Sequence, residues 1–254
     1  MFEARFANAT LLKRILDAIK ELVTDVNLLC TEEGIELQAM DAAHVALVNF
    51  TILADACTLY ACTEPITLGI NVVNFAKIVK CSEATDSVLL THTKDGDTLG
   101  ITFESANGSR KAEYGMKLMD IDSEHLEIPE VAYACSVTLP SSEFSRLMKD
   151  MANFGNTVTL HVKDDVFIVE TIGDMGLATV TVKQDKVSKQ PTEIECSKET
   201  KMMFPLNYLV TFTKAQNISE QVSLYLSENI PIHVSYDMGD KGTIGYHLAP
   251  KLDE

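Results

Sequence analysis

The chain repeats one pattern of local structure four times, and this internal period constrains its fold more than any other feature. Four segments carry apolar residues at helical spacing, and they begin near positions 8, 71, 141 and 205. The sequence between them alternates apolar and polar residues, as it does around Val222, Leu224 and Leu226. A repeat of about 65 residues therefore predicts a duplicated unit made of one helix and several strands.

The expected helices are short and amphipathic, and they span residues 8–23, 71–81, 141–154 and 205–216. Asn8, Asn71 and Ser141 suit the position before a helix, because their side chains accept a hydrogen bond from a free backbone N–H. Pro205 suits the first helical turn, where a missing N–H costs nothing.

The four units pair into two halves, so the predicted fold class is α+β, with two similar domains that each pack two helices against antiparallel sheet. The domains are expected at residues 1–117 and 135–254. Residues 118–134 mix acidic residues with a few apolar ones, and we interpret them as an interdomain connecting loop. A chain of 254 residues is long enough to build both cores.

Positive charge is concentrated on the helices of an acidic chain. The formal net charge is −16 and the pI is near 4.7, yet the expected helices hold eight basic residues against four acidic ones. The basic residues are Lys13, Arg14, Lys20, Lys77, Lys80, Arg146, Lys149 and Lys214. Such residues often only solvate the outer face of a helix. The same bias in all four helices favours a shallow, sequence-independent contact with the phosphates of duplex DNA.

The motifs of common enzyme classes are absent from the sequence, which holds no phosphate-binding loop, GxGxxG, HExxH or GxSxG. We interpret the pairs Asp120/Asp122 and Asp95/Asp97 as solvated acids rather than metal ligands. Six cysteines without CxxC spacing are interpreted as free thiols in a reducing compartment. We therefore expect no enzyme activity, no catalytic residue, no metal, no cofactor and no membrane partner.

Several short stretches resemble one known family. They are residues 1–5 (MFEAR), 37–45 (LQAMDAAHV), 117–122 (KLMDID), 128–130 (IPE), 212–215 (FTKA) and 248–251 (LAPK). The stretches run from one end of the chain to the other, and the chain resembles the DNA sliding clamps of the proliferating cell nuclear antigen family. The resemblance implies a head-to-tail homotrimer that closes into a ring around duplex DNA, with the helices lining the hole.

By the same resemblance, two strands supply the contacts between subunits. The sequence alone shows both as ordinary alternating strands and does not indicate which strands lie at a sheet edge. The first comprises Ser109, Arg110, Lys111, Ala112, Glu113 and Tyr114, and the second comprises Leu177, Ala178, Thr179, Val180, Thr181 and Val182.

The resemblance also implies a hydrophobic pocket for short partner peptides, which carry a glutamine followed by one aliphatic and two aromatic residues. The matching positions are Met40, His44, Val45, Leu47, Leu126, Ile128, Pro129, Tyr133, Pro231, His247, Leu248, Ala249 and Pro250. His247 stands where the family pattern has a tyrosine, and Glu127 stands where a small residue is common. If the imidazole of His247 faces the pocket, peptide affinity should change between about pH 5.5 and 7.5.

The function that this resemblance implies is that of a processivity factor for the replicative DNA polymerase and a docking platform for replication and repair proteins in the nucleus. The implied partners are DNA polymerase, the clamp loader, flap endonuclease and DNA ligase. Lys163 lies near a family site for ubiquitin-type modification. Two alternatives stay open, namely a checkpoint-type clamp subunit in a heterotrimer and an acidic protein-binding adaptor that does not encircle DNA.

Overall fold

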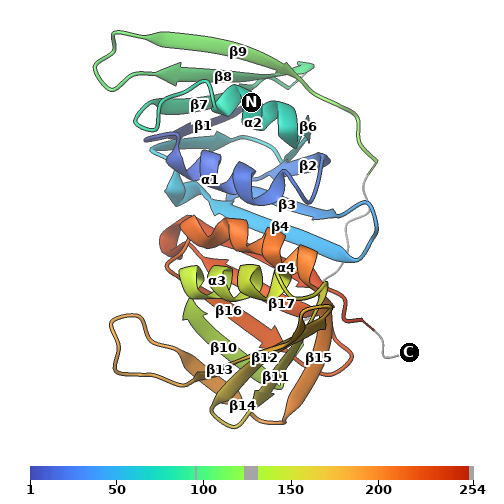
Figure 1. Ribbon diagram of the computed structural model, residues 1–254. Coiled ribbons are helices and arrows are strands. Elements are labelled where there is room, and N and C mark those ends of the chain that lie inside the picture. Colours follow the sequence, from blue (N-terminus) through green and yellow to red (C-terminus); the bar gives the residue numbers. More distant parts are fainter. Residues whose placement is uncertain (95, 123–130, 252–254) are drawn as a thin grey trace. The chain divides into compact units, whose positions relative to one another are not determined.

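The computed structural model describes residues 1–94, 96–122 and 131–251, which divide into two compact units (Figure 1). Among these residues, unit 1 contains 1–42, 48–122 and 238–244, and unit 2 contains 43–47, 131–237 and 245–251. Asp95 lies outside the described residues, as do Glu127 and three members of the expected pocket, which are Leu126, Ile128 and Pro129.

Unit 1 places two helices against two groups of antiparallel strands. Its elements are β1 (Phe2–Phe6), α1 (Thr10–Ile19), β2 (Asp25–Cys30), β3 (Gly34–Met40), β4 (Ala46–Leu53), η1 (Ala54–Ala56), β5 (Leu59–Cys62), β6 (Ile66–Asn71), α2 (Val72–Val79), β7 (Ser87–His92), β8 (Thr98–Glu104), β9 (Lys111–Lys117) and η3 (Gly239–Lys241). One sheet has the order β5-β1-β7-β8-β9, and the second group has the order β4-β3-β2-β6.

Unit 2 repeats this plan. Its elements are β10 (Cys135–Pro140), α3 (Ser141–Ala152), β11 (Thr157–Lys163), β12 (Val166–Gly173), β13 (Gly176–Lys183), β14 (Glu193–Cys196), β15 (Thr200–Pro205), α4 (Leu206–Phe212), η2 (Thr213–Asn217), β16 (Gln221–Leu226), β17 (Ile232–Asp237) and β18 (Gly242–Leu248). One sheet has the order β13-β12-β11-β15, and the second group has the order β14-β10-β16-β17-β18. The alternating segments of the sequence are therefore strands, as predicted.

Each unit has its own core, formed where the apolar stripes of two adjacent helices meet the strands. In unit 1, Ile15 and Ile19 of α1 and Phe75 of α2 are at most 2% exposed, and α1 contacts α2. In unit 2, Phe144 and Met148 of α3 are fully buried, and α3 contacts α4 and η2. Burial of these stripes turns the charged helix faces outward. Within the described ranges, no helix has both the length and the apolar character that crossing a membrane requires.

The helix boundaries confirm part of the prediction and correct the rest. The side chain of Asn71 accepts the backbone N–H of Asn74 at 2.9 Å and caps α2, as expected. Asn8 accepts the N–H of Thr10 at 3.0 Å, but the residue directly before α1 is Ala9. The expectation for Ser141 is wrong, because Ser141 is itself the first residue of α3. Pro205 precedes α4 instead of joining its first turn, because its backbone is still extended.

The first residues after β9 are bound to the body of unit 1. The N–H of Met119 donates to the Gly69 carbonyl at 2.9 Å, and the side chain of Asn27 donates to the Ile121 carbonyl at 2.8 Å. A Cβ atom at Gly69 would lie 2.0 Å from the Met119 carbonyl oxygen, so this approach requires glycine. The start of the expected connecting loop is therefore fixed along β6.

Candidate functional site

The two helices of each unit lie side by side (Figure 1). Their apolar residues are buried, and most of their basic residues are exposed. The exposed members of the predicted DNA-facing set are Arg14, Lys77, Lys80, Arg146, Lys149 and Lys214. Long cationic side chains on a rigid helix can exchange between phosphate oxygens without reading base edges. The helix pairs therefore present the chemistry of non-specific DNA contact in both units.

Two other predicted residues, Lys13 and Lys20, are half-buried and have partners within unit 1. Lys13 donates from its Nζ atom to the Ser82 carbonyl at 2.6 Å, just beyond the end of α2. Lys20 forms an ion pair with Asp17 one turn earlier on the same helix. Because Lys13 and Lys20 are half-buried, they are less accessible to a phosphate than the exposed six, of which Arg146 also has an acidic neighbour, Glu143, at 3.6 Å.

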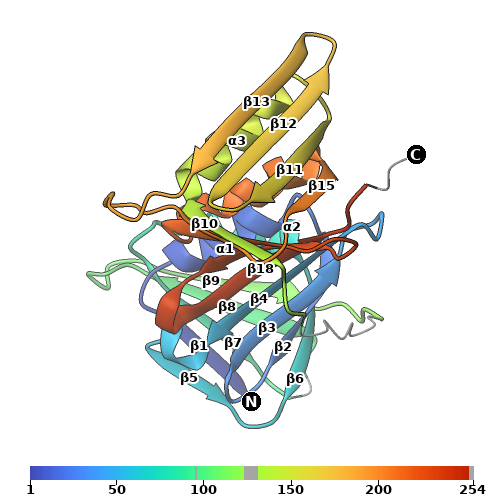
Figure 2. The same ribbon diagram turned by 90° about the horizontal axis from the view of Figure 1, so that it is seen from below.

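The strands predicted to join subunits lie at sheet edges. β9 ends the five-stranded sheet of unit 1, and β13 ends the four-stranded sheet of unit 2 (Figures 1 and 2). An edge strand leaves a row of backbone donors and acceptors beside which another strand can pair. Within the described part of the chain no strand covers the outer edge of β9 or of β13, so both edges are available for strand addition.

On β9, an aromatic residue, Tyr114, ends the predicted contact segment 109–114. The ring of Tyr114 packs on Phe103 of β8 with a centroid distance of 5.5 Å. A hydrogen bond with Cys81 raises the pKa of the Tyr114 hydroxyl. Before β9, Arg110 pairs with the buried carboxylate of Asp86 at 2.6 Å, which anchors the turn that contains Ser109. The predicted residues 109–114 thus form a supported edge.

On β13, the backbone geometry shows which groups face the open edge. Gly173 and Gly176 are register partners on either side of a two-residue turn, so their pair is hydrogen-bonded and every second pair after it is also bonded. Thr179, opposite Glu170, belongs to the alternate set, whose N–H and C=O groups point away from β12. Leu177, at 63% exposure, adds apolar surface beside this row. The edge therefore offers backbone donors, backbone acceptors and apolar contact.

Four aromatic rings form a continuous row on unit 2. Tyr133 lies 5.7 Å from Tyr225, Tyr225 lies 5.4 Å from His233, and His233 stacks on His247 at 4.4 Å with the ring planes 8° apart. The imidazole of His247 is therefore part of a ring stack in the region predicted to bind peptides.

Burial changes the expected titration of this row. Desolvation lowers the pKa of His233, and it lowers the pKa of His247 to about 4, with a smaller contribution from the charge of His233. A protonated imidazole in the stack would be both desolvated and next to a second histidine. The expected pH window of about 5.5 to 7.5 applies to an unperturbed histidine, whereas a pKa of about 4 keeps His247 neutral throughout that window.

The remaining predicted pocket residues divide into an exposed group and a buried group. His44 and Pro231 are exposed, and Val45, Ala249 and Pro250 are half-buried. The N–H of Ala249 donates to the Val45 carbonyl at 3.1 Å, which joins residues 43–47 to residues 247–250 within unit 2. Leu47 and Leu248 are buried at 8% and 0% exposure, so they support this surface from below. Met40 is half-buried at the end of β3 in unit 1.

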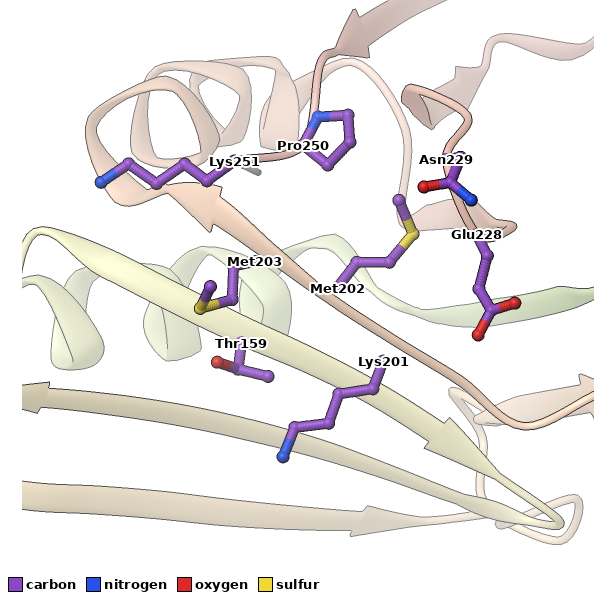
Figure 3. Close-up of a pocket in the computed structure, with 8 residues that line it drawn as sticks. All are labelled: Thr159, Lys201, Met202, Met203, Glu228, Asn229, Pro250 and Lys251. Atoms are coloured by element: carbon purple, nitrogen blue, oxygen red, sulfur yellow. The ribbon is translucent and has the colours of Figure 1, made fainter. Parts of the chain in front are cut away.

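A groove of about 730 Å³ begins at the end of this surface (Figure 3). It is lined by Thr159, Lys201, Met202, Met203, Glu228, Asn229, Pro250 and Lys251. The side chain of Lys251, which lines one end of the groove, donates to the Thr157 hydroxyl at 2.8 Å. The groove combines methionine side chains with charged and amide groups, so it can take a polar side chain on an aliphatic stem.

The sequence analysis did not assign Tyr225 and His233 to this site. They are direct register partners on β16 and β17, and both lie on the face of those strands that is not buried. The alternation of Leu224 and Leu226 with Tyr225 indicates which face Tyr225 occupies. The pairing of the two strands, which the sequence does not reveal, was needed to put the rings together.

The predicted modification site, Lys163, is exposed at the end of β11, where its Nζ atom lies 3.5 Å from the Glu199 carboxylate. The ring of His161 lies 2.8 Å from the other oxygen of that carboxylate. Glu199 therefore positions Lys163 without covering it.

Comparison with known proteins assigns the chain to a family. Residues 1–125 match the model for the N-terminal domain of proliferating cell nuclear antigen, and residues 127–251 match the model for its C-terminal domain. The chain is also similar to a proliferating cell nuclear antigen from Chaetomium thermophilum, at 39% identity over 257 residues, covering 100% of this chain and 99% of the relative. The chain belongs to the proliferating cell nuclear antigen family.

Membership confirms the predicted fold class, a duplicated α+β clamp fold with two related domains. It also establishes the function at the level of the family. The protein is a DNA sliding clamp that serves as a processivity factor in DNA replication, and it belongs to a non-enzymatic clamp family whose partners are DNA and replication proteins.

Proposed function

We propose that three copies of this chain close head to tail into a ring around duplex DNA, with β9 of one subunit paired to β13 of the next. The observation that carries the proposal is that β9 and β13 each end their sheet with the outer edge uncovered by any strand of the described residues. The two edges differ in sequence, so the contact between subunits is head to tail. Such a contact forms a closed ring only when the rotation from one subunit to the next divides a full turn evenly. A homotrimer with such a contact pairs every β9 edge with a β13 edge.

The charge distribution supports encirclement over tight binding. The net charge of −16 discourages contact with DNA over most of the surface. The exposed helix cations named above supply a modest number of phosphate contacts, which can exchange as the protein moves along the duplex. A closed ring needs little affinity, because it cannot leave the DNA sideways. The arrangement thus suits sliding.

Partner proteins, in this proposal, dock on unit 2 through a short peptide. The ring row and its neighbours His44, Pro231, Ala249 and Pro250 would receive the aliphatic and aromatic residues of the peptide. By the family resemblance, Leu126, Ile128 and Pro129 belong to the same pocket, and they lie outside the described residues. The groove beyond Pro250 would receive the preceding glutamine, whose amide could bond to Lys201, Glu228 or Asn229. DNA polymerase, the clamp loader, flap endonuclease and DNA ligase are the partner classes expected to carry such peptides.

The rest of the proposal follows from this role. The protein would act in the nucleus, where its duplex DNA and its partners lie, with domains at residues 1–117 and 135–254 and a connecting loop at 118–134. It would hold and release partners without catalysing a reaction. The exposed Lys163 would serve as an acceptor for ubiquitin-type modification.

The experiment that tests the ring combines mass with topology. Light scattering at micromolar concentration should give three times 28.0 kDa, and protein loaded on nicked circular DNA should be retained until the DNA is linearised. A stable monomer would contradict the ring and would favour the acidic adaptor. A trimer that leaves circular and linear DNA equally fast would contradict encirclement.

A further inference from the structure

Two cysteines of unit 2 lie side by side on neighbouring strands. Cys135 begins β10 and Cys196 ends β14, and the antiparallel register places them directly opposite each other. Their Sγ atoms lie 2.9 Å apart. Cys135 is 2% exposed, whereas Cys196 is only half-buried, so an oxidant in solution can reach one member of the pair.

The backbone around the pair has the geometry that a disulfide needs. The N–H of Ser197 donates to the Ala134 carbonyl at 2.8 Å, so Ala134 and Ser197 form a hydrogen-bonded pair and Cys135 and Cys196 form the next, non-hydrogen-bonded pair. Cα atoms in such a pair are about 4.5 Å apart, which lies within the range of about 4.4–6.8 Å that disulfides span. The bond could therefore form without separating or shifting the strands.

Hydrogen bonds already hold both sulfur atoms in place. Cys135 donates from Sγ to the Lys198 carbonyl at 3.1 Å, and Cys196 donates from Sγ to the Val162 carbonyl at 3.6 Å. Both thiol hydrogens can thus point at carbonyl oxygens while the sulfur atoms face each other. The four other cysteines have no such contact: Cys62, for example, points its Sγ atom at the Cys30 and Glu64 carbonyls.

We propose that Cys135 and Cys196 form a reversible redox site, in which a peroxide oxidises the two thiols to a disulfide that joins β10 to β14. The Cys196 thiolate attacks hydrogen peroxide to give a sulfenic acid and hydroxide, which becomes water when it takes up the thiol proton. Cys135 then displaces the sulfenic hydroxyl, which leaves as a second water, and the S–S bond forms. The two thiols lose two electrons and one peroxide gains them.

The bond would act on the edge of its sheet. β14 is the terminal strand next to β10, and Ser197 binds Ala134, the last residue of the expected connecting loop, through both its N–H and its hydroxyl. The disulfide would link two positions that are 61 residues apart in the sequence. It would also fix the point where the connecting loop enters unit 2. Reduction by a dithiol would release it.

The site should react slowly near neutral pH. Burial raises the pKa of Cys196 to about 11, and a hydrogen bond with Cys135 adds to the effect. Only a small fraction of the thiol is ionised at pH 7, and this fraction rises about tenfold per pH unit. The site is thus suited to sustained oxidising conditions and not to brief signals.

The test treats the full-length protein with hydrogen peroxide, blocks free thiols and maps tryptic peptides without reduction. We expect a linked pair of peptides, 118–146 with 190–198, which dithiothreitol separates and which forms about tenfold faster at pH 8 than at pH 7. Thermal unfolding of the oxidised protein should shift upward by roughly 5 °C or more. The variant Cys196→Ser should lose both effects, and Cys81→Ser, which changes an exposed cysteine, should keep both.

Three results would overturn the proposal. In the first, both Cys135 and Cys196 still react with the alkylating agent after peroxide treatment. In the second, Cys196 is oxidised to a sulfinic acid and no linked peptide forms. In the third, either cysteine forms a disulfide with a different cysteine. The Cys196→Ser variant changes a half-buried side chain and is expected to fold. A failure of the buried Cys135→Ser variant to fold would therefore leave the test intact.

Discussion

Units 1 and 2 are built from the same order of helices and strands, yet they carry different side chains at corresponding places. The edge strand of unit 1, β9, presents Tyr114 supported by Phe103, whereas the edge strand of unit 2, β13, presents a row of threonines beside Leu177. Both helix pairs expose lysine or arginine, but the row of stacked rings belongs to unit 2. The two units thus share a frame and exposed helix cations, while the side chains of their edge strands differ.

The largest expected effect comes from removing the aromatic residue of β9. Tyr114→Ala should convert the proposed trimer into monomers, because truncating an aromatic anchor of a contact costs about 2 kcal/mol or more and the ring contains three such contacts. Sedimentation at nanomolar to micromolar concentrations would measure this. Tyr114→Phe is the matched control and should remain a trimer, since it keeps the ring and loses only the hydroxyl.

The second prediction tests whether the two edges bind each other. Thr179→Pro removes an N–H that faces the open edge of β13 and breaks no bond to β12, so it should block assembly without unfolding the sheet. Mixing Thr179→Pro with Tyr114→Ala should yield a dimer of one copy of each, because only one intact pair of edges is available. If Thr179→Pro alone formed dimers, β9 would be pairing with another β9.

The third prediction compares the helix pairs of the two units. The double variants Lys77→Ala/Lys80→Ala in unit 1 and Arg146→Ala/Lys149→Ala in unit 2 should each weaken DNA binding and lower the slope of log K against log salt by about 2. Folding and trimer mass should not change, since all four side chains are exposed. An unchanged slope for one variant would mean that its unit does not contact DNA.

The smallest effect concerns a group that unit 2 alone provides. Native His247 has a pKa of about 4, well below that of the unfolded chain, so the unfolded state takes up a proton first as the pH falls. Above about pH 6.5, His247 is neutral in both states and does not affect the free energy of unfolding. As the pH falls from there toward 4, the unfolded state binds the proton more readily, so the free energy of unfolding decreases. The decrease is up to about 2 kcal/mol after allowance for solvent screening.

Thermal unfolding of wild type and His247→Tyr between pH 7 and 4.5 would measure the contribution of His247 to stability. The carboxylates titrate in both proteins, so their effect cancels in the comparison. The wild type should lose more stability than the variant over this range. Peptide affinity, measured by calorimetry, should not depend on His247 between pH 5.5 and 7.5. A wild-type affinity that changed across that window, with a flat profile for the variant, would show that His247 titrates at its ordinary pKa.

The sequence was sufficient to predict the elements whose pattern is local. Alternation around Val222 and Ile232 identified β16 and β17, and the apolar stripe with Asn71 identified α2. Predictions that depend on neighbours in space were beyond it. The patterns of β9 and β13 are those of any alternating strand, and the sequence spacing of Cys135 and Cys196 gives no sign that they meet.

The same limit explains what was missed or wrong in the candidate site. The unperturbed titration assumed for His247 ignored the rings of His233 and Tyr225, which come from two other strands. Lys13 and Lys20 matched the exposed lysines in helical position, but their partners Ser82 and Asp17 depend on side-chain geometry. Sequence periodicity thus indicates which face a residue occupies, and only the packed structure indicates what lies beside it.

The uncovered hairpin of β12 and β13 has a consequence for the life of a newly made subunit. Ile172, Met175 and Leu177 are 76%, 67% and 63% exposed around its turn, next to an open strand edge. A lone subunit therefore carries the features that promote aggregation and recognition by chaperones and proteases. Assembly would bury the edge, so the cell's pool of unassembled subunits should be short-lived. Oligomerisation in this protein would then serve proteostasis as well as DNA replication.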